Sequence, residues 1–226
     1  MSFLPVKLQN DRLKLGLWKI EEDEQFFRDR LNIYENEEKI LANIRHPRKK
    51  LEWLSSRLCM KTILNITHRV ESLNEQTGRP FLTGSPYHIS YSHSNNYAGA
   101  IASDAFVVAM DLEDLTKQRN LKSRFLFMHP KELEYFEAAG DLRCFYLIWS
   151  GKETLYKLYA NRGLAFRDNL LIDFEDQPLK EKGSVKGYIN QAGNQYEYEI
   201  NYQFFTEILL TYTYCPDGLC PHVVRE

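Results

Sequence analysis

The chain has 226 residues, of which 43% are hydrophobic and 13% aromatic, and this composition excludes a disordered chain. The formal net charge is −2, so the basic excess of a general nucleic-acid-binding protein is missing. Because no apolar run approaches the roughly 18 residues that span a membrane, and because the first residues lack the apolar segment of a signal peptide, we expect a cytoplasmic protein that binds neither membranes nor nucleic acid.

The first half of the chain predicts a strand, then helices, then strands. Leucines that alternate with polar residues predict a strand over residues 11–20, and the acidic amphipathic segment at residues 21–31 predicts a first helix. A second helix is expected from Pro47 to residue 67, where the apolar residues keep helical spacing. Turn residues follow, and then three strands are expected to form an antiparallel meander at residues 88–94, 97–103 and 106–113.

The second half predicts two helices and then four strands. The first helix is expected at residues 129–139, with Pro130 in its first turn, and the second at residues 144–159, with Gly163 as its C-cap. The strands are expected at residues 170–175, 186–190, 196–202 and 208–214, with turns at residues 181–184 and 191–194. This order indicates an α+β protein with two halves, although the residues themselves show no sequence repeat.

Two acidic residues lie two positions apart in the strand expected at residues 106–113. The side chains of Asp111 and Glu113 therefore point to the same face of that strand. Adjacent like charges cost free energy unless a cation neutralises them, and carboxylate oxygens are ligands that suit Mg²⁺. The alternative is a strand that emerges into a solvated acidic turn, which Asp114 continues.

The most hydrophobic of the expected helices carries Glu153 and Lys157, which are four residues apart and therefore share a helix face. A glutamate can ligate a metal or accept a proton, and a lysine can stabilise the charge that develops on a phosphate. The alternative is an exposed Glu–Lys pair that contributes only to helix stability. The apolar and aromatic residues that flank the pair indicate a mostly buried helix, which weakens this alternative.

Ser92 and His93 lie near the end of the strand expected at residues 88–94. Small hydroxyl groups beside a histidine can donate hydrogen bonds to a phosphate. A histidine that only structures a turn is one alternative. A Ser/His/Asp hydrolase is another, but the chain has no GxSxG motif near these residues.

The four cysteines are too few for a disulfide scaffold. Cys59 and Cys144 stand alone, whereas Cys215 and Cys220 form a close pair near the C-terminus. A metal site that includes His222 is one interpretation of this pair. We favour the other interpretation, two reduced thiols in a turn.

Taken in order, these segments resemble the 4'-phosphopantetheinyl transferase superfamily. The family pattern is a GKP-type turn, an SHS segment, a [GA]xDxE strand and a WxxKExxxK helix. The matching segments, within residues 48–166, are Gly78-Arg79-Pro80, Ser92-His93-Ser94, Ala109 to Glu113, and Trp149 to Lys157. The chain departs from the family pattern where Arg79 replaces a lysine and Ala109 replaces a glycine, and its N-terminal third shows little similarity. The length resembles the surfactin-synthetase-activating type, which is a monomer of two similar halves.

The resemblance implies a 4'-phosphopantetheinyl transferase fold, with two similar α/β halves related by a pseudo-twofold. We expect the halves to be residues 1–105 and 106–226. The implied enzyme transfers the 4'-phosphopantetheine arm of coenzyme A to a serine of an acyl or peptidyl carrier protein. Mg²⁺ is the implied cofactor, coenzyme A is the co-substrate, and the protein is expected to be a monomer.

The resemblance also implies roles for individual residues. Asp111, Glu113 and Glu153 would hold Mg²⁺, and Asp111, Glu153 and Lys157 would form the catalytic set. The residues implied to bind coenzyme A are Arg48, Arg79, Ser92, His93 and Lys157. One alternative is a Mg²⁺-dependent phosphodiesterase that uses the same carboxylates, and the near-neutral charge disfavours a nucleic-acid substrate for it. The other is a non-catalytic coenzyme A-binding protein, which would not need a general base.

A basic segment, residues 117–124, directly follows the acidic strand. It contains four basic residues and no acidic one, and an apolar block follows it. The family resemblance implies that the carrier protein is acidic around its serine. We therefore expect the basic segment to dock the carrier protein, and the alternative is a solvated helix face.

Overall fold

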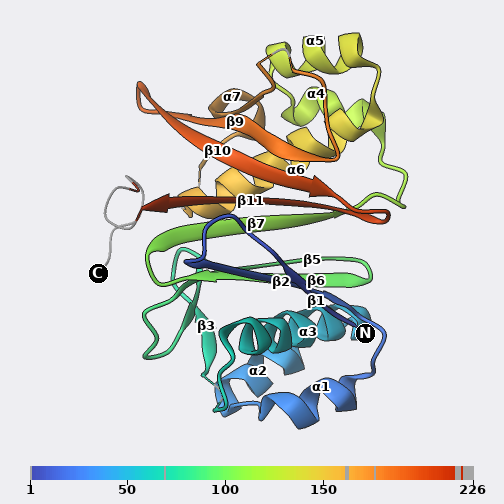
Figure 1. The fold of residues 1–226 in the computed structure, drawn as a ribbon. Coiled ribbons are helices and arrows are strands. Elements are labelled where there is room, and N and C mark those ends of the chain that lie inside the picture. Colours follow the sequence, from blue (N-terminus) through green and yellow to red (C-terminus); the bar gives the residue numbers. More distant parts are fainter. Residues whose placement is uncertain (1, 69, 161–162, 176, 217–219, 221–226) are drawn as a thin grey trace. The chain divides into compact units, whose positions relative to one another are not determined.

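The computed structural model of the protein describes residues 2–68, 70–160, 163–175, 177–216 and 220. The chain forms two compact units, Met1–Val108 and Ala109–Glu226 (Figure 1). Each unit combines helices with one antiparallel sheet, so the α+β class that the sequence predicts is confirmed.

The first unit contains a six-stranded sheet with the order β1-β2-β6-β5-β4-β3. Its strands are β1 (Phe3–Val6), β2 (Leu13–Lys19), β3 (Ser72–Asn74), β4 (Pro80–Leu82), β5 (His88–Ser94) and β6 (Tyr97–Ser103). Its helices are α1 (Glu24–Leu31), α2 (Glu35–Asn43) and α3 (Pro47–Leu64). The strands predicted at residues 11–20, 88–94 and 97–103 and the two predicted helices are therefore confirmed.

Helix α3 packs against β2, β5 and β6 and forms one side of the first core (Figure 1). Pro47 occupies its first turn, where the missing N–H costs nothing, and Asn65 ends it in the left-handed conformation with φ 53°. Large apolar side chains from both layers fill the space between helix and sheet, and Leu54 and Ala100 are fully buried there.

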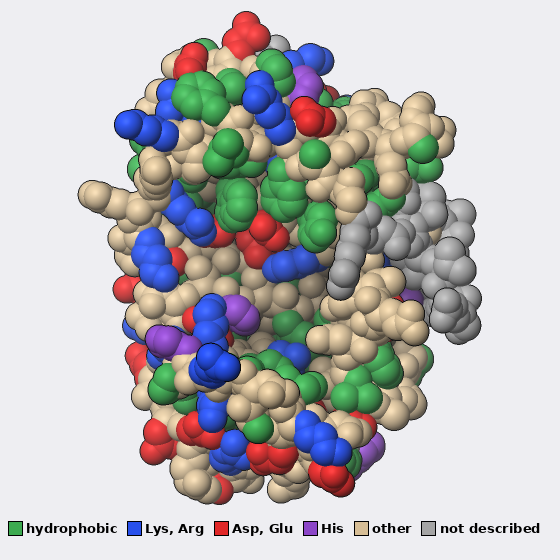
Figure 2. Space-filling view, turned by 180° about the vertical axis from the view of Figure 1, so that it is seen from behind, with side chains coloured by type: hydrophobic (Ala, Val, Ile, Leu, Met, Phe, Trp, Pro, Cys, Tyr) green, Lys and Arg blue, Asp and Glu red, His purple; other side chains and the backbone are tan. Residues whose placement is uncertain are grey.

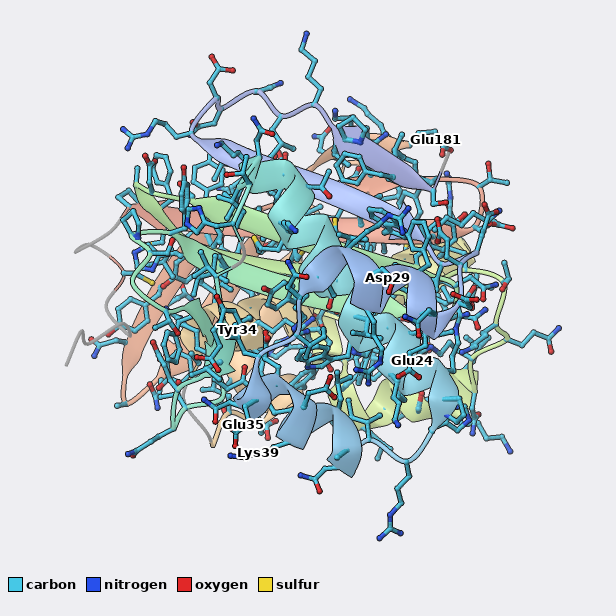
Figure 3. All side chains as sticks on the ribbon, turned by 90° about the horizontal axis from the view of Figure 1, so that it is seen from below. Glu24, Asp29, Tyr34, Glu35, Lys39 and Glu181 are labelled. Atoms are coloured by element: carbon cyan, nitrogen blue, oxygen red, sulfur yellow. The ribbon has the colours of Figure 1, made fainter. Side chains whose placement is uncertain are left out.

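Helix α2 is an element that the sequence pattern does not predict, because Glu37 and Leu41 are its only buried residues. Its first turn is held by Glu37, whose Oε2 accepts a hydrogen bond from the backbone N–H of Tyr34 at 3.0 Å. On its exposed side, Lys39 Nζ lies 2.8 Å from Glu35 Oε1 (Figure 3). Local capping and side-chain pairing therefore support this helix more than an apolar stripe does.

The second unit contains a five-stranded sheet with the order β7-β11-β10-β9-β8. Its strands are β7 (Phe106–Asp114), which begins three residues before the boundary between the units, β8 (Leu170–Asp173), β9 (Lys182–Gln191), β10 (Asn194–Phe204) and β11 (Ile208–Pro216). Its helical segments are η1 (Leu121–Ser123), α4 (Arg124–Phe127), α5 (Pro130–Ala139), α6 (Leu142–Tyr159) and α7 (Phe166–Asn169). Helix α6 packs against β8 to β11, and the two helices and four strands predicted for this half are confirmed.

The two units share one strand topology that the sequence does not reveal as a repeat. In the first, β2 pairs with the last strand, β6, and the order continues β5-β4-β3. In the second, β7 pairs with the last strand, β11, and the order continues β10-β9-β8. An 18-residue helix, α3 or α6, lies between the first strand and the others along each chain segment. The expectation of two similar halves therefore holds at the level of topology, with β1 as an additional edge strand of the first unit.

The expected meander of three strands is wrong in its last member. Strand β6 is paired on one side with β5 and on the other with β2, so it has no free edge for β7. Strand β7 instead joins the second sheet beside β11. Neighbours in sequence thus belong to different sheets.

Two further predictions for the second half, a turn at residues 181–184 and a helix C-cap at Gly163, are also wrong. Residues 182–184 form the start of β9 rather than a turn, and Gly183 is needed there because a Cβ atom would lie 2.9 Å from the Tyr202 hydroxyl. Helix α6 is capped by Ala160, which adopts the left-handed conformation with φ 54°, and not by Gly163.

The surface agrees with the composition. On the face that Figure 2 shows, basic and acidic side chains are interspersed, as the small net charge leads us to expect. None of the helices in the described part of the chain combines the length and the apolar character that a membrane crossing requires.

Helix α6 is held in place by a buried ion pair. Lys152 is fully buried, and its Nζ lies 2.7 Å from Glu132 Oε2 of α5. The same Nζ donates to the backbone oxygens of Phe127 at 2.7 Å and Phe166 at 2.8 Å. Glu132 in turn accepts from the backbone N–H of Ile172 at 2.7 Å. The pair therefore joins α4, α5, α6, α7 and β8 around one ammonium group.

We expect Lys152→Met to lower the free energy of unfolding by about 3–5 kcal/mol, because the substitution leaves the Glu132 carboxylate buried without its counter-ion. Adding Glu132→Gln should restore part of the loss, since the amide oxygen still accepts from Ile172. Urea denaturation measures both, with the exposed Lys182→Met as the matched control. A loss below about 1 kcal/mol for Lys152→Met would show that the pair does not support the fold.

Candidate functional site

The acidic residues of β7 are buried. Asp111, Glu113 and Asp114 are 6%, 5% and 4% exposed, which disagrees with a solvated acidic turn. Asp114 serves the local backbone, because its Oδ1 accepts from the Thr116 N–H at 2.8 Å. Asp111 and Glu113 are two residues apart in the strand, as the sequence predicts, and each is paired with a cation of the same unit.

One face of α6 surrounds the Asp111 carboxylate. Lys157 Nζ donates to Asp111 Oδ1 at 2.7 Å and to the backbone oxygen of Met110 at 3.0 Å. Ser150 Oγ donates to Asp111 Oδ2 at 2.9 Å. Ser150 and Lys157 are seven residues apart, which is two helical turns, so a single helix face supplies both contacts. Both oxygens of Asp111 are thereby oriented.

Buried hydroxyl groups support this face of α6 from β11. Thr211 Oγ1 lies 2.8 Å from Ser150 Oγ and 2.7 Å from Thr154 Oγ1, and it is 3.1 Å from the backbone oxygen of Ser150. All three hydroxyl residues are fully buried. The network fixes the rotamer of Ser150, and through it the position of Asp111.

Arg119 pairs with Glu113, since its Nη2 donates to Glu113 Oε2. The guanidinium also lies over the Trp149 ring, 5.7 Å from its centroid. Burial raises the pKa of Glu113 to about 7, and the charge of Asp111 acts in the same direction, whereas Arg119 acts in the opposite one. The carboxyl groups of Asp111 and Glu113 are therefore close enough to interact electrostatically.

Glu153 lines a pocket of about 520 Å³ in the second unit. The walls are mostly apolar and aromatic, and the lining residues are Arg119, Ser123, Leu126, Phe127, Phe145, Trp149, Glu153 and Phe166. Burial raises the pKa of Glu153, and the charge of Asp111 adds to this, against Lys157 and Arg119. A half-buried carboxyl group at an apolar pocket disagrees with an exposed helix pair and suits a proton acceptor.

The donor chemistry of these carboxylates fits a divalent cation. Asp111 acts electrostatically on both Glu113 and Glu153, and hard oxygen donors with excess negative charge are what Mg²⁺ prefers. Within the described residues, no three His, Cys, Asp or Glu side chains are grouped so as to enclose a metal ion. Asp111 and Glu113 are instead paired with Lys157 and Arg119.

In the first unit, Arg48 holds the turn after β5. Its Nε and Nη2 donate to the backbone oxygen of Asn95 at 2.9 and 2.7 Å, and Nη2 also donates to Asn96 Oδ1 at 2.8 Å. Asn95 has a positive φ of 51°. Arg48 therefore has a structural contact besides the coenzyme A contact that the family resemblance implies.

The other residues of this unit that are implied to bind coenzyme A lie in different surroundings. His93 is exposed at the end of β5, and its Nδ1 lies 3.1 Å from Glu52 Oε2. Ser92 is 5% exposed, and as the preceding residue in the strand it points to the other face. Arg79 lies in the turn before β4, where its N–H donates to Thr77 Oγ1 at 3.3 Å. The structure thus brings Arg48 and His93 to the same end of β5.

The basic segment, residues 117–124, is a loop followed by η1 rather than a regular helix. Two of its basic residues have internal partners, because Arg119 pairs with Glu113 and Arg124 lies over Phe125, 4.2 Å from the ring centroid. Lys117 and Lys122 are exposed. Three apolar side chains beside them are exposed as well: Leu121, Phe125 and Leu126, at 40%, 48% and 80%.

All four cysteines are buried, and none forms a disulfide in the described part of the chain. Burial raises the pKa of Cys144 to about 11. A hydrogen bond with Cys220 and burial raise the pKa of Cys215. These thiols agree with the reduced pair that we favour, and His222 lies outside the described residues.

Several contacts around the candidate site residues are missed by reasoning from sequence. No local spacing reveals contacts between segments that are distant in sequence. Such contacts involve Ser150, Thr211 and Glu52, and the pairing of Arg119 with Glu113 is also not part of any motif. Lys152 stands within the same helical motif as Glu153, but its full burial, not the motif, distinguishes it as a structural anchor.

Comparison with known proteins places this site in a family. Residues 107–213 match the family model described as the 4'-phosphopantetheinyl transferase superfamily. A search of the curated proteins finds no match to the chain. The matched range begins in β7, ends in β11 and contains Asp111, Glu113, Glu153 and Lys157. This match identifies residues 107–213 as a region of the 4'-phosphopantetheinyl transferase superfamily.

Proposed function

We propose that the protein transfers the 4'-phosphopantetheine arm of coenzyme A to a serine of an apo acyl or peptidyl carrier protein. Mg²⁺ is the proposed cofactor, and 3',5'-ADP is the product that leaves. The observation that carries this proposal is the arrangement of Asp111, Glu153 and Lys157 around one face of α6, inside the range that matches the superfamily.

Glu153 is the proposed general base. It accepts the proton of the carrier serine, whose oxygen attacks the phosphorus that bears the pantetheine arm. A new P–O bond forms, and the bond between this phosphorus and the oxygen of 3',5'-ADP breaks. The raised pKa of Glu153 makes it a stronger base than an exposed carboxylate, and its place at the pocket allows a substrate to approach.

Lys157 and the β7 carboxylates serve the pyrophosphate. Lys157 is 30% exposed, so its amino group can reach an anionic ligand while its stem stays packed. Asp111, Glu113 and Glu153 are the proposed ligands of Mg²⁺, which when bound would offset the charge of the pyrophosphate oxygens. Ser150 and Thr211 keep Asp111 in position for that role.

The first unit is proposed to bind coenzyme A phosphates through Arg48, Arg79, Ser92 and His93. Support comes from Arg48 and His93, which lie at the same end of β5. The shared topology of the two units supports the two-half, monomeric type within the superfamily. We further propose that the protein acts in the cytoplasm.

Incubation with coenzyme A, Mg²⁺ and an apo carrier protein should add one phosphopantetheine group to the carrier, as measured by intact mass. Chelation of Mg²⁺ should stop the reaction. Asp111→Asn should raise the Mg²⁺ concentration needed for half-maximal rate by about tenfold or more, because it removes a charged oxygen ligand but keeps the shape. Release of phosphopantetheine into solution without a carrier would instead indicate a phosphodiesterase. No mass gain on several carriers, with folded enzyme, would refute the proposal.

Glu153→Gln should reduce kcat by about 10²–10⁴-fold, because the amide keeps the shape of the side chain but does not accept the proton. KM for coenzyme A should change much less. The control is Glu197→Gln, which removes an exposed carboxylate of β10 in the same unit. Turnover within a few-fold of the unsubstituted protein would remove Glu153 from the role of base.

The basic segment and its apolar neighbours are the proposed docking surface for an acidic carrier protein. Phe125→Ser should raise KM for the carrier by about tenfold, as expected for the loss of an aromatic anchor. The double substitution Lys117→Glu and Lys122→Glu should raise the same KM and reduce its dependence on salt. Arg119 is left unchanged because it pairs with Glu113.

Matched controls for this surface lie in the same unit. Leu142 is as exposed as Phe125, at 48%, so Leu142→Ser tests the loss of an exposed apolar group elsewhere. Lys182→Glu tests a charge reversal on β9. If the controls raise KM for the carrier as much as the substitutions in the segment do, the segment is an ordinary solvated surface.

A further inference from the structure

A buried carboxylate stands behind His93 in the first unit. Glu52 comes from the second turn of α3, and its side chain is only 4% exposed. Its Oε2 lies 3.1 Å from His93 Nδ1 and 2.6 Å from Lys49 Nζ. The side chain of His93 is 39% exposed, so the ring contacts the carboxylate through Nδ1 and is also partly accessible to solvent.

The Glu52 carboxylate determines that Nδ1 of His93, the ring nitrogen that faces it, carries a hydrogen. Burial acts to raise the pKa of Glu52, but hydrogen bonds from His93 and Lys49 outweigh it and lower the pKa to about 2. Glu52 is therefore ionised at neutral pH and can only accept hydrogen bonds. Nδ1 of His93 must then carry a hydrogen, and Nε2 is the nitrogen that remains for a ligand.

The same face of α3 holds the backbone on which His93 stands. Arg48 precedes Glu52 by four residues, one helical turn, and it donates to the backbone oxygen of Asn95, two residues after His93. Both the ring and the end of β5 are thus anchored to α3. Burying a charge costs free energy. A buried carboxylate that contacts a partly exposed imidazole therefore suits orientation of the ring better than an ordinary surface ion pair does.

We propose that Glu52 is a positioning residue, which holds the His93 ring so that Nε2 faces the phosphates of coenzyme A. This inference rests on the proposed function for the identity of the ligand. The orientation of the ring itself does not depend on coenzyme A, and it can be measured separately.

The first measurement is the tautomeric state of His93 by ¹⁵N NMR of the full chain without ligand. In the unsubstituted protein, the neutral ring should carry its hydrogen on Nδ1. Glu52→Ala should shift it toward the Nε2–H form, and Glu52→Gln should keep the Nδ1–H form, because the amide oxygen still accepts. Lys49→Met is the matched control, since it removes the other partner of the same carboxylate and should leave the tautomer unchanged. An Nδ1–H form that persists in Glu52→Ala would overturn the proposal.

The second measurement is steady-state transfer. Glu52→Ala should raise KM for coenzyme A by roughly tenfold, the size expected when a hydrogen bond to a charged group is misplaced. The kcat and the KM for the carrier should stay within about twofold, and Glu52→Gln should restore most of the loss. A changed tautomer with an unchanged KM for coenzyme A would also overturn the proposal. The proposed transferase function would not be affected by that result. If the unsubstituted protein transfers nothing, the proposed function fails, and the NMR result still decides whether Glu52 positions the ring.

Discussion

The arrangement of the second unit depends on the three hydrogen bonds of one buried ammonium group. Removing an ammonium ion from water costs several kcal/mol, so Lys152 is tolerated only because Glu132 and two backbone oxygens satisfy it together. These partners come from separate segments, and a shift of any one leaves a buried charge or donor unsatisfied. Trp149 and Glu153, which lie within one turn of Lys152 in α6, are therefore held in a fixed position as well. Gly151 contributes as well, because it allows a close approach to β8: a Cβ atom there would lie 2.9 Å from Ile172 Cδ1.

Two of the carboxylates of β7 are paired with cations of the same unit. Lys157 pairs with Asp111, and Arg119 pairs with Glu113. In the proposed reaction, the phosphates of coenzyme A are alternative partners for these two basic groups, and Mg²⁺ is an alternative partner for the carboxylates. Binding of the two ligands would therefore be linked. When the phosphates bind Lys157 and Arg119, the carboxylates are released to bind Mg²⁺, and when Mg²⁺ binds the carboxylates, the two basic groups are released to bind the phosphates.

The sequence predicts most of the fold where periodicity is strong and where neighbours in sequence are neighbours in space. Helix α3 is an example of helical spacing of apolar residues, and strands β5 and β6 are consecutive strands that pair with each other. The pairing of β7 is not predictable in this way, because it depends on which edge of β6 is already occupied by β2. Helix α2 has too few buried residues for a pattern to appear.

The same distinction applies to the candidate site. Spacing places Asp111 with Glu113 and Glu153 with Lys157, and the resemblance to the family joins the two pairs into one candidate site, which the range of the family match contains. Spacing does not show that Lys157 contacts Asp111, or that Glu52 contacts His93, because each contact joins segments about 40 residues apart or more. Ser92 illustrates the limit of a motif, since it stands next to His93 but is buried.

The two edge strands of the first sheet affect how the protein behaves in concentrated solution. An exposed strand edge is a template for pairing with another chain, and proteins avoid this with prolines and with very short edge strands. Strand β1 carries Pro5, opposite Gly16 of β2, and strand β3 has three residues. Removal of the residues that form β1 would uncover the edge of β2, which is seven residues long and rich in buried leucine. An N-terminal truncation would therefore create an aggregation-prone edge, even though it leaves the proposed catalytic residues untouched.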